Sequence, residues 1–415
     1  MNVASMRRID RWIGAPMCAV LTLVRRLDDL VLRRKPGKPE RIAIIKLAEQ
    51  GATVVAYDAL TAARDRVGAD NLFFVVFSQN RFILDLLHVV PEENVLEIRA
   101  KNAFTTAIDV VRVVWRMHRE RIDTALDFEF FARSSAILTY LSGARNRVGF
   151  HAFAGEASYR GDLMTHRLSF NPFLHAGHVF RLVVEALRFP PERLPAVDWI
   201  PPEHGPLPEH RPEADEVAKV RAIMDDVLGG VDARHVVLLN ANCSDMVPLR
   251  RWPRERYVEL ARRLLDRYPD LAVMFTGAPE EAQQAGELVS EVGERRCVSI
   301  AGKTTLAQLV VLYGLADLLV TNDSGPAHFA SLTPIDIVVL FGPETPEVFR
   351  PLGPRCNVLY AGTACSPCIN AFNDRQSSCP DNVCMQEITL DQVFDLSCRV
   401  FDARRAMTPA TSHGS

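Results

Sequence analysis

The stretch RIAIIKLAEQGATVVAYDALTAARDRV, residues 41–67, indicates the fold class of this chain. Residues 41–47 form a continuous apolar run bounded by polar residues, as expected for a strand that is buried on both faces. Residues 53–67 follow with the composition of a helix. A buried strand followed by a helix is the repeating unit of a parallel sheet covered by helices. The stretch therefore predicts an α/β protein.

The same alternation continues along the chain in two series. Further strands of the first series are expected at 71–77, 94–98, 122–128 and 147–150, with a helix at 104–120. Strands of the second series are expected at 235–240, 272–277, 297–300, 318–322 and 337–342, with helices at 254–268 and 305–316. Between the series, residues 188–214 contain eight prolines, too many for a helix or a central strand. The pattern predicts two doubly wound domains, in which ligands bind at the carboxyl ends of the strands.

Length and composition narrow the possible functions. The chain has 415 residues, of which 48% are hydrophobic, and this suits two domains. The net charge of −3 gives no electrostatic reason to expect nucleic-acid binding. The sequence contains no apolar run of the roughly 18 residues that a transmembrane helix needs.

Residues 1–40 differ in composition from the rest, with nine basic and four acidic residues. An apolar stretch from Trp12 to Val24 is flanked by arginines, is too short to span a bilayer and precedes no small-x-small cleavage site. We expect a helix that lies on the membrane, with its arginines on anionic head groups. The side chains expected to insert are Trp12, Ile13, Leu21, Leu23 and Leu27. The alternative is a helix packed on the protein's own core.

A polar turn follows a predicted strand in VTNDSGPAHFASL, residues 320–332. Asp323 or Ser324 can cap the next helix. Gly325 allows a close backbone approach, and Pro326 suits the first helical position. The backbone N–H groups at such a helix start favour a phosphate group. Taken alone, the stretch fits an ordinary capped helix equally well.

Three further turns follow strands of the same predicted sheet. LFGPETPEVFRPLGP, residues 340–354, is a second long turn rich in glycine and proline. NANCSDMVPLRRWPRERY, residues 240–257, brings Arg250, whose guanidinium suits phosphate, although a solvated basic loop is the alternative. TGAPEEAQ, residues 276–283, offers Glu281 or the glutamate before it to ribose hydroxyls. Glutamates also favour helix N-termini for dipole reasons alone.

In this order, the four pieces resemble glycosyltransferase family 9, the ADP-heptose:lipopolysaccharide heptosyltransferases. The resemblance covers roughly residues 41–395 and is strongest in TNDSGPAHFASL, LFGPETPEVFRPLGP and LRRWPRERYVELARRLL. It implies a GT-B fold, in which two Rossmann-like domains face each other across a cleft. The nucleotide-sugar donor would bind mainly to the C-terminal domain and the acceptor to the N-terminal domain.

The resemblance also implies roles for individual residues. Those expected at the donor diphosphate and sugar are Asp323, Ser324, Gly325, Pro326 and His328, with Arg250 on phosphate and Glu281 as a further donor contact. No catalytic metal is expected, because basic side chains and backbone N–H groups stabilise the leaving diphosphate. The implied enzyme transfers a heptose-like sugar, with inversion, from a nucleotide-diphosphate donor to a lipopolysaccharide-core or related lipid-linked glycan. Its implied location is peripheral, on the cytoplasmic face of the bacterial inner membrane.

The sequence departs from the family at the turn after its first strand. Family members usually have Gly-Asp there, and that aspartate is the expected base. Here Gly51 matches on the acceptor side, but Ala52 stands at the position of the aspartate. Glu49 in the same turn is our candidate base, and Asp58 is a less suitable one because it falls inside a helix. The alternative is that Glu49 is a loop residue and the chain is a catalytically impaired, membrane-associated binding protein with the GT-B fold.

Four cysteines are spaced C-x2-C-x10-C-x4-C in CSPCINAFNDRQSSCPDNVC. They are Cys365, Cys368, Cys379 and Cys384. Such thiols fit a structural tetrahedral zinc site or paired disulfides, and a cytoplasmic location favours zinc or reduced thiols.

One more loop, GFHAFAGEASYRGDLMTHRL at residues 149–168, is a candidate acceptor loop, with Arg160 and His166 as contacts to anionic sugar groups. The predicted organisation is a membrane-associating segment at 1–40, an acceptor domain at 41–187, a linker at 188–232, a donor domain at 233–400 that contains the cysteine-rich segment 365–384, and a disordered tail at 401–415.

Overall fold

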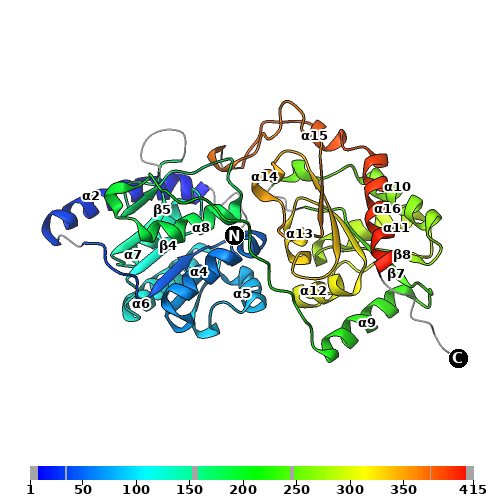
Figure 1. Ribbon diagram of the computed structural model, residues 1–415, viewed down its shortest axis with the longest axis horizontal. Helices are drawn as coiled ribbons and strands as arrows, with labels where there is room; N and C mark the ends of the chain where they lie inside the picture. The colour runs from blue at the N-terminus through cyan, green and yellow to red at the C-terminus, as the bar shows by residue number, and fades with distance from the viewer. Residues whose placement is uncertain (1–7, 33–34, 152–157, 244–246, 374, 408–415) are drawn as a thin grey trace. The chain divides into compact units, whose positions relative to one another are not determined.

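The computed structural model describes residues 8–32, 35–151, 158–243, 247–373 and 375–407 (Figure 1). The chain forms two compact units. Unit 1 comprises Met1–Gly205 together with Asn370–Gln376, and unit 2 comprises Pro206–Ile369 and Ser377–Ser415. The change of unit after residue 205 falls inside the stretch expected to be a linker, whose later part forms helix α9 (Ala214–Leu228) of unit 2.

Unit 1 is built on a parallel sheet of six strands in the order β3-β2-β1-β4-β5-β6. The strands are β1 (Ile42–Ile45), β2 (Leu72–Phe77), β3 (Val95–Ile98), β4 (Thr124–Asp127), β5 (Asn146–Phe150) and β6 (His166–Leu168). The helices are α2 (Ala15–Leu32), α3 (Gln50–Val55), α4 (Tyr57–Val67), α5 (Phe82–Leu87), α6 (Ala103–Arg119), α7 (Arg133–Leu141) and α8 (Ala176–Glu185). This is the doubly wound order, and its switch point lies between β1 and β4.

Unit 2 repeats the same topology in the strand order β12-β11-β10-β7-β8-β9. The strands are β7 (His235–Asn240), β8 (Leu271–Phe275), β9 (Cys297–Ser299), β10 (Leu318–Asn322), β11 (Asp336–Phe341) and β12 (Cys356–Tyr360). The helices after α9 are α10 (Arg254–Arg267), α11 (Ala282–Val292), α12 (Leu306–Leu315), α13 (Gly325–Ala330), α14 (Pro346–Phe349), α15 (Val383–Gln386) and α16 (Leu390–Met407). Its switch point lies between β7 and β10.

The central strands are buried on both faces, as their continuous apolar runs predict. Every residue of β1, β4, β8 and β10 is buried. In unit 1, Ala43 and Ile45 of β1 pack with Val113 and Met117 of α6. The expected α/β class and the doubly wound order of each sheet are therefore confirmed.

Helix α2 packs one face on unit 1 and exposes the other. Cys18 and Thr22 are buried, and the Arg25 guanidinium donates to the Asp162 carboxylate at 2.5 Å. Leu21, expected to insert into a membrane, instead packs half-buried beside Ile137 of α7. Thus the alternative of a helix packed on the protein's own core describes one face of α2.

The other expected insertion residues of this segment lie on the surface. Trp12 is 73% exposed, and Ile13, Leu23 and Leu27 are also exposed. Residues 1–7 of the predicted segment lie outside the described part of the chain. Within that described part, no helix combines the length and the apolarity needed to cross a bilayer.

The beginning of the predicted disordered tail is helical. Helix α16 extends to Met407, and the Phe401 side chain is fully buried, with its ring 4.9 Å from that of Tyr268 and 5.3 Å from that of His235. The prediction for 401–407 was wrong because burial of this ring extends the helix beyond residue 400. Residues 408–415 lie outside the described residues.

Candidate functional site

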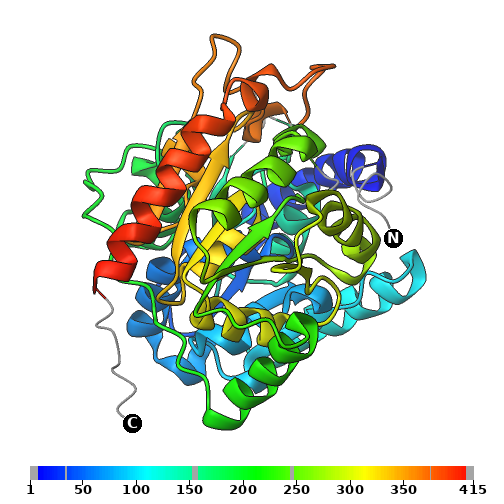
Figure 2. The same cartoon turned by 90° about the vertical axis from the view of Figure 1, so that its right-hand side faces the viewer.

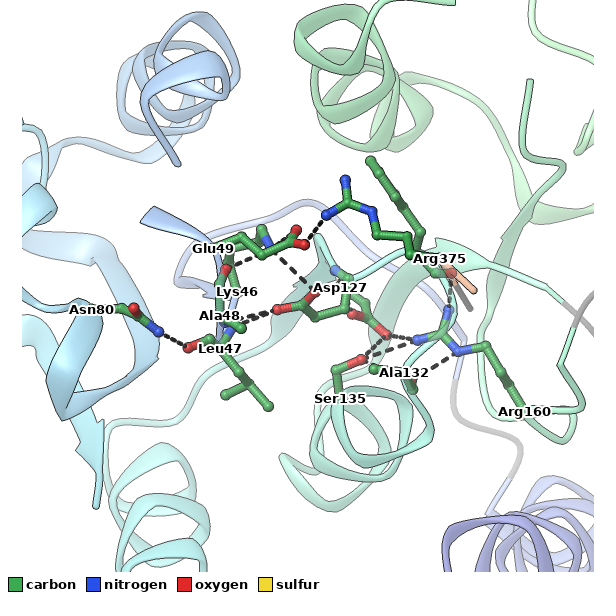
Figure 3. Close-up of polar contacts among 12 residues, drawn as sticks. Lys46, Leu47, Ala48, Glu49, Asn80, Asp127, Ala132, Ser135, Arg160 and Arg375 are labelled. Atoms are coloured by element: carbon green, nitrogen blue, oxygen red, sulfur yellow. Dashed lines mark hydrogen bonds and ion pairs between the residues drawn. The ribbon is translucent and has the colours of Figure 1, made fainter. Parts of the chain in front are cut away.

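The turn after β1, at the switch point of unit 1, is held by side chains from two neighbouring strand ends (Figure 3). The Glu129 carboxylate, just beyond β4, accepts from the backbone N–H groups of Leu47 at 2.8 Å and Ala48 at 3.1 Å. Asn80, just beyond β2, donates its amide to the Leu47 carbonyl at 2.9 Å. These contacts fix the backbone that leads to Glu49.

Glu49, the candidate base, has a left-handed backbone with φ of 67° and precedes α3. Its Oε2 lies 3.4 Å from Nζ of the buried Lys46, and its Oε1 forms an ion pair with Arg375. Lys46 also contacts Oε2 of Glu129 at 3.1 Å. Glu49 is therefore held at the strand end as a carboxylate between two cations, with a quarter of its side chain exposed (27%).

Gly51 and Asp58 lie further along the chain from this turn. Gly51 is buried in α3, two residues after Glu49. Asp58 is in α4, where it forms an ion pair with Arg181 of α8 at 2.9 Å. Asp58 is thus occupied at a helix pair and does not join the turn contacts around Glu49.

Arg375 reaches Glu49 from the cysteine-rich segment. Residues 370–376 group with unit 1 although their sequence neighbours belong to unit 2. The Phe372 ring lies 5.5 Å from that of Phe131 and 5.4 Å from that of Phe170. This part of the segment therefore completes the surroundings of Glu49, a role that the cysteine spacing did not indicate.

Arg160 and His166, the expected acceptor contacts, lie inside unit 1. Arg160 forms an ion pair with the buried Asp127 and donates to the backbone carbonyls of Phe130 at 2.9 Å and Phe150 at 3.0 Å. Burial lowers the pKa of His166 to about 4, so its ring is neutral at pH 7. Both predictions were wrong, because internal hydrogen bonds and burial occupy these side chains. Residues 152–157 of the predicted loop lie outside the described residues.

In unit 2, Asn322 joins the elements around the switch point. Its side-chain oxygen accepts from the Trp252 backbone N–H at 3.0 Å and from the Tyr257 hydroxyl at 3.1 Å. Its amide donates to the carbonyls of Ala241 at 3.1 Å and Asn242 at 3.2 Å, just after β7. The asparagine of the quoted turn thus ties β10 to the end of β7 and the start of α10.

Three charged side chains meet at the carboxyl ends of β7, β10 and β11. Arg250 follows β7, and its Nη1 lies 3.6 Å from Oδ2 of Asp323, which follows β10. The same nitrogen lies 3.7 Å from Oε2 of Glu344, which follows β11. All three are buried, with Glu344 only 1% exposed. The structure thus brings the predicted Arg250 and Asp323 together and adds Glu344, which sequence reasoning missed.

Helix α13 starts beside this cluster. Ser324 is its N-cap residue, but the Ser324 hydroxyl donates to the Asn322 carbonyl at 3.1 Å instead of capping the helix. Gly325 and Pro326 open the helix, and His328 lies buried within it. A Cβ atom at Gly325 would meet only ordinary contacts with Phe329, at 3.6 Å, so internal packing does not require a glycine there.

Glu281 lies on the other side of β7, in the turn after β8. Its Oε2 accepts from the Ala278 backbone N–H at 2.7 Å and so caps the short 3-10 turn Pro279–Glu281 that precedes α11. This is the local role that the alternative reading of these glutamates predicted. The residues 244–246, within the basic turn after β7, lie outside the described residues.

The cysteine-rich segment does not form the predicted zinc site. Among the described residues, which include all nine cysteines, no group of three or more histidine, cysteine or acidic side chains is placed to hold a metal ion, and no disulfide is formed. Cys365 is exposed, Cys368 and Cys379 are half-buried, and Cys384 packs into the core beneath Gly342. The four thiols thus differ in burial, and their arrangement is not one that could hold a metal ion.

Comparison with known sequences assigns these sites to a family. The profile of glycosyltransferase family 9 (heptosyltransferase) matches residues 111–377, more than half of the chain. The chain belongs to glycosyltransferase family 9. The matched region includes the Arg250, Asp323 and Glu344 cluster and Arg375, whereas Glu49 lies before it. The resemblance drawn from the turns is confirmed.

Curated relatives of this family 9 member match it over part of their length. Lipopolysaccharide heptosyltransferase 2 of Escherichia coli K12 is 32% identical over 115 residues, which are 27% of this chain and 32% of that protein. Lipooligosaccharide heptosyltransferase 2 of Haemophilus ducreyi is 27% identical over 232 residues, 54% of this chain and 62% of that protein. The chain therefore spans less than two thirds of the length of these relatives.

Solved structures share the fold over nearly their whole length. The E. coli ADP-heptose lipopolysaccharide heptosyltransferase II has a TM-score of 0.63 at 18% identity, and covers 88% of this chain and 99% of its own. A family 9 glycosyl transferase from Veillonella parvula has a TM-score of 0.65 at 17% identity, and the match covers 89% of this chain and 99% of that chain. At these identities the likeness concerns the fold, and it confirms the α/β class with two Rossmann-like domains predicted for a GT-B protein.

Proposed function

We propose that this family 9 member is an inverting glycosyltransferase that transfers a heptose-like sugar from a nucleotide-diphosphate donor to a lipopolysaccharide-core or related lipid-linked glycan. The observation that supports this most is the buried Arg250 between Asp323 and Glu344 at the switch point of unit 2. A doubly wound sheet binds its ligand at this place. The relatives named as heptosyltransferases support the choice of sugar.

In the proposed reaction, an acceptor hydroxyl oxygen attacks the anomeric carbon of the donor from the face opposite the diphosphate. The new C–O bond forms as the bond to the diphosphate breaks, and its electron pair leaves with the phosphate oxygen. Arg250 and the backbone N–H groups at the start of α13 stabilise that negative charge. These groups allow the transfer to proceed without a catalytic metal ion. Ser324, Pro326 and His328 complete the donor side, with Glu281 as a candidate contact to the donor ribose.

We propose that Glu49 is the general base that accepts the proton of the acceptor hydroxyl. The general base must be unprotonated before the reaction, and the two cations beside Glu49 favour its carboxylate form. The same cations make a carboxylate a weaker base, so acceptor binding has to displace or weaken one of the ion pairs. Arg375 is the partner that such a change would involve, because Lys46 is buried and also bound to Glu129.

The acceptor would be lipid-linked, so we propose a peripheral location on the cytoplasmic face of the bacterial inner membrane. The exposed apolar face of α2, with Trp12, Leu23 and Leu27, supports contact with an anionic membrane surface. The other face of α2 is anchored on unit 1, which makes this contact a property of the folded domain.

A second candidate is a membrane-associated binding protein that keeps the fold without turnover. It is favoured by Ala52 at the position of the family's aspartate and by the ion pair between Glu49 and Arg375, which occupies the substitute carboxylate. This candidate predicts donor binding without sugar transfer.

The test combines donor binding and turnover. We expect the purified chain to bind ADP and ADP-heptose in calorimetry and to release ADP when ADP-heptose and a lipid-linked acceptor are both present. Glu49→Gln should lower kcat about a hundredfold and leave donor affinity unchanged. Asp58→Asn is the matched control, because that carboxylate is paired with Arg181 in a helix pair.

Each outcome separates the candidates. Donor binding with no ADP release in the wild type would favour the binding protein. Turnover that survives Glu49→Gln but is lost in Asp58→Asn would move the base to α4. Absence of binding to any nucleotide sugar would refute the proposed donor site.

A further inference from the structure

Helix α6 of unit 1 has an exposed apolar stripe opposite its buried face. Its inner face packs Val113 and Met117 into the core of the unit. Its outer face exposes four large apolar side chains: Phe104 (75%), Ile108 (41%), Val111 (68%) and Trp115 (58%). The spacing of four, three and four residues puts them on one line along the helix. A continuous stripe of this kind, with two aromatic residues, marks an interaction surface on a folded protein.

The charges around this stripe are basic. Arg112 is 63% exposed, and the Arg119 guanidinium lies over the Trp115 ring, 5.4 Å from its centroid. The acidic residues of α6 do not oppose them on this face. Asp109 is buried and bound to Arg99 and Arg112, while Glu120, at the end of α6, is bound to Arg41 and Arg116. Apolar and aromatic side chains beside arginines match the interfacial region of an anionic bilayer.

Helix α6 also lies on the same side of unit 1 as α2. Helix α7 contacts both of them, and Figure 2 shows the blue α2 and the cyan α6 along the same side of the unit. The exposed side chains of α2 include Trp12, Leu23 and Leu27. Both helices therefore flank α7, and a surface that covers this layer of helices can contact both.

We propose that the α6 stripe is a second membrane-docking surface, which binds anionic phospholipid together with α2. Phe104, Ile108, Val111 and Trp115 insert between the head groups, and Arg112 and Arg119 contact lipid phosphates. Two helices fix the orientation of unit 1 on the bilayer, whereas α2 alone would leave it free to rotate about one helix axis. This inference rests on the proposed function for the choice of a membrane as the partner. The observations that support it, however, come from α6 and not from α2.

The test is binding of the full chain to vesicles of phosphatidylethanolamine and phosphatidylglycerol, measured by flotation. The double variant Phe104→Ser/Trp115→Ser should bind at least tenfold more weakly than the wild type, because two large aromatic side chains no longer insert. Arg119→Gln should bind about fivefold more weakly at low salt, and this difference should vanish at high salt. Ile200→Ser is the matched control, since Ile200 is an apolar side chain of the same unit outside α2 and α6, with 89% exposure.

A second double variant, Leu23→Ser/Leu27→Ser, separates this inference from the proposed function. Loss of binding in that variant, with wild-type binding by Phe104→Ser/Trp115→Ser, would overturn the α6 inference and leave the role of α2 intact. Wild-type binding by both double variants would instead refute the membrane association itself. A change of sedimentation from dimer to monomer in Phe104→Ser/Trp115→Ser, without a change in vesicle binding, would assign the stripe to a second copy of the chain and also overturn the inference.

Discussion

The contact between Glu129 and the turn after β1 leads to a specific expectation for Glu129→Gln. Glu129 is 13% exposed and accepts from two backbone N–H groups and from Lys46. The amide of glutamine keeps one acceptor oxygen, but it carries no charge and turns an N–H₂ group toward the Lys46 ammonium. The substitution therefore weakens all three contacts while it preserves the size and shape of the side chain.

The size of the effect follows from the conformation of Glu49. Its left-handed backbone, with φ of 67°, costs roughly 1–3 kcal/mol for a residue with a side chain. Hydrogen bonds to charged groups contribute roughly 1.5–3 kcal/mol each. If Glu129→Gln removes about 2 kcal/mol of this support, the turn that holds Glu49 becomes less favoured by that amount relative to relaxed conformations. A loss of about 2 kcal/mol lowers the ratio of the competent to the relaxed turn roughly thirtyfold, and this factor is the largest fall expected in kcat.

The assay is ADP release with a saturating donor, together with calorimetric titration of ADP-heptose. We expect kcat to fall by up to about thirtyfold with unchanged donor affinity, because the proposed donor groups belong to unit 2. Glu120→Gln is the control, since Glu120 pairs with Arg41 and Arg116 at the amino end of β1, opposite to this turn. An unchanged kcat combined with a lower melting temperature would show that Glu129 supports only the fold, and a fall in donor affinity alone would remove it from the turn's function.

Three other predictions test different parts of the chain. Asp323→Asn should weaken binding of ADP-heptose at least tenfold in calorimetry without weakening that of ADP, and equal losses for both would place Asp323 on the nucleotide. Burial lowers the pKa of His166 to about 4 in the folded chain. In the unfolded chain the pKa of a histidine is about 6.5, so between these two values the unfolded chain binds a proton that the folded chain does not. The free energy of unfolding should be highest above pH 6.5 and fall by up to about 3 kcal/mol toward pH 4, and His166→Gln should flatten this dependence in urea titrations. Phe401→Ala should lower the stability of unit 2 by about 3–5 kcal/mol, whereas an unchanged melting transition would mean that α16 adds nothing beyond residue 400.

Local patterns were enough to predict the strands of both sheets except the edge strands β6 and β12, and to predict the turn after β10. A run such as residues 41–47 is apolar without interruption, because both faces of a central parallel strand are covered. The sequence TNDSGPAH contains the local signals that end a strand and start a helix: polar residues at the strand end, a glycine, and a proline at the start of the helix. These features depend on neighbours in the sequence, so one sequence is enough to find them.

The contacts that complete the sites depend on residues far apart in the sequence. Glu344 lies in a glycine- and proline-rich turn, whose sequence is typical of a solvent-exposed loop. Its burial becomes understandable only from the structure, where Arg250 lies beside its carboxylate. Arg160 looked like an exposed loop residue until β4 placed Asp127 against it. Arg375 reaches Glu49 because Phe372 anchors its segment among the aromatic rings of unit 1. No local pattern encodes these pairings.

For helix α6, the sequence predicts the helix but not which of its faces is buried. Its apolar residues lie on two faces, so their period predicts a helix but does not say which face is buried. The structure buries Val113 and Met117 and leaves Phe104 and Trp115 exposed. The distinction comes from the sheet against which the helix packs, and it is the exposed set that points to a partner.

The switch points of the two units contain clusters of opposite character. In unit 1 one carboxylate, Glu49, lies against the cations Lys46 and Arg375, and in unit 2 one cation, Arg250, lies against the carboxylates of Asp323 and Glu344. A diphosphate that approaches Arg250 must therefore compete with two carboxylates, which costs free energy for a nucleotide diphosphate alone. A sugar attached to that diphosphate brings hydroxyl donors, which the displaced carboxylates can accept. In the proposed transferase, the buried acids would then favour the intact donor over the released product, and this is the discrimination that such an enzyme needs in order to release its product.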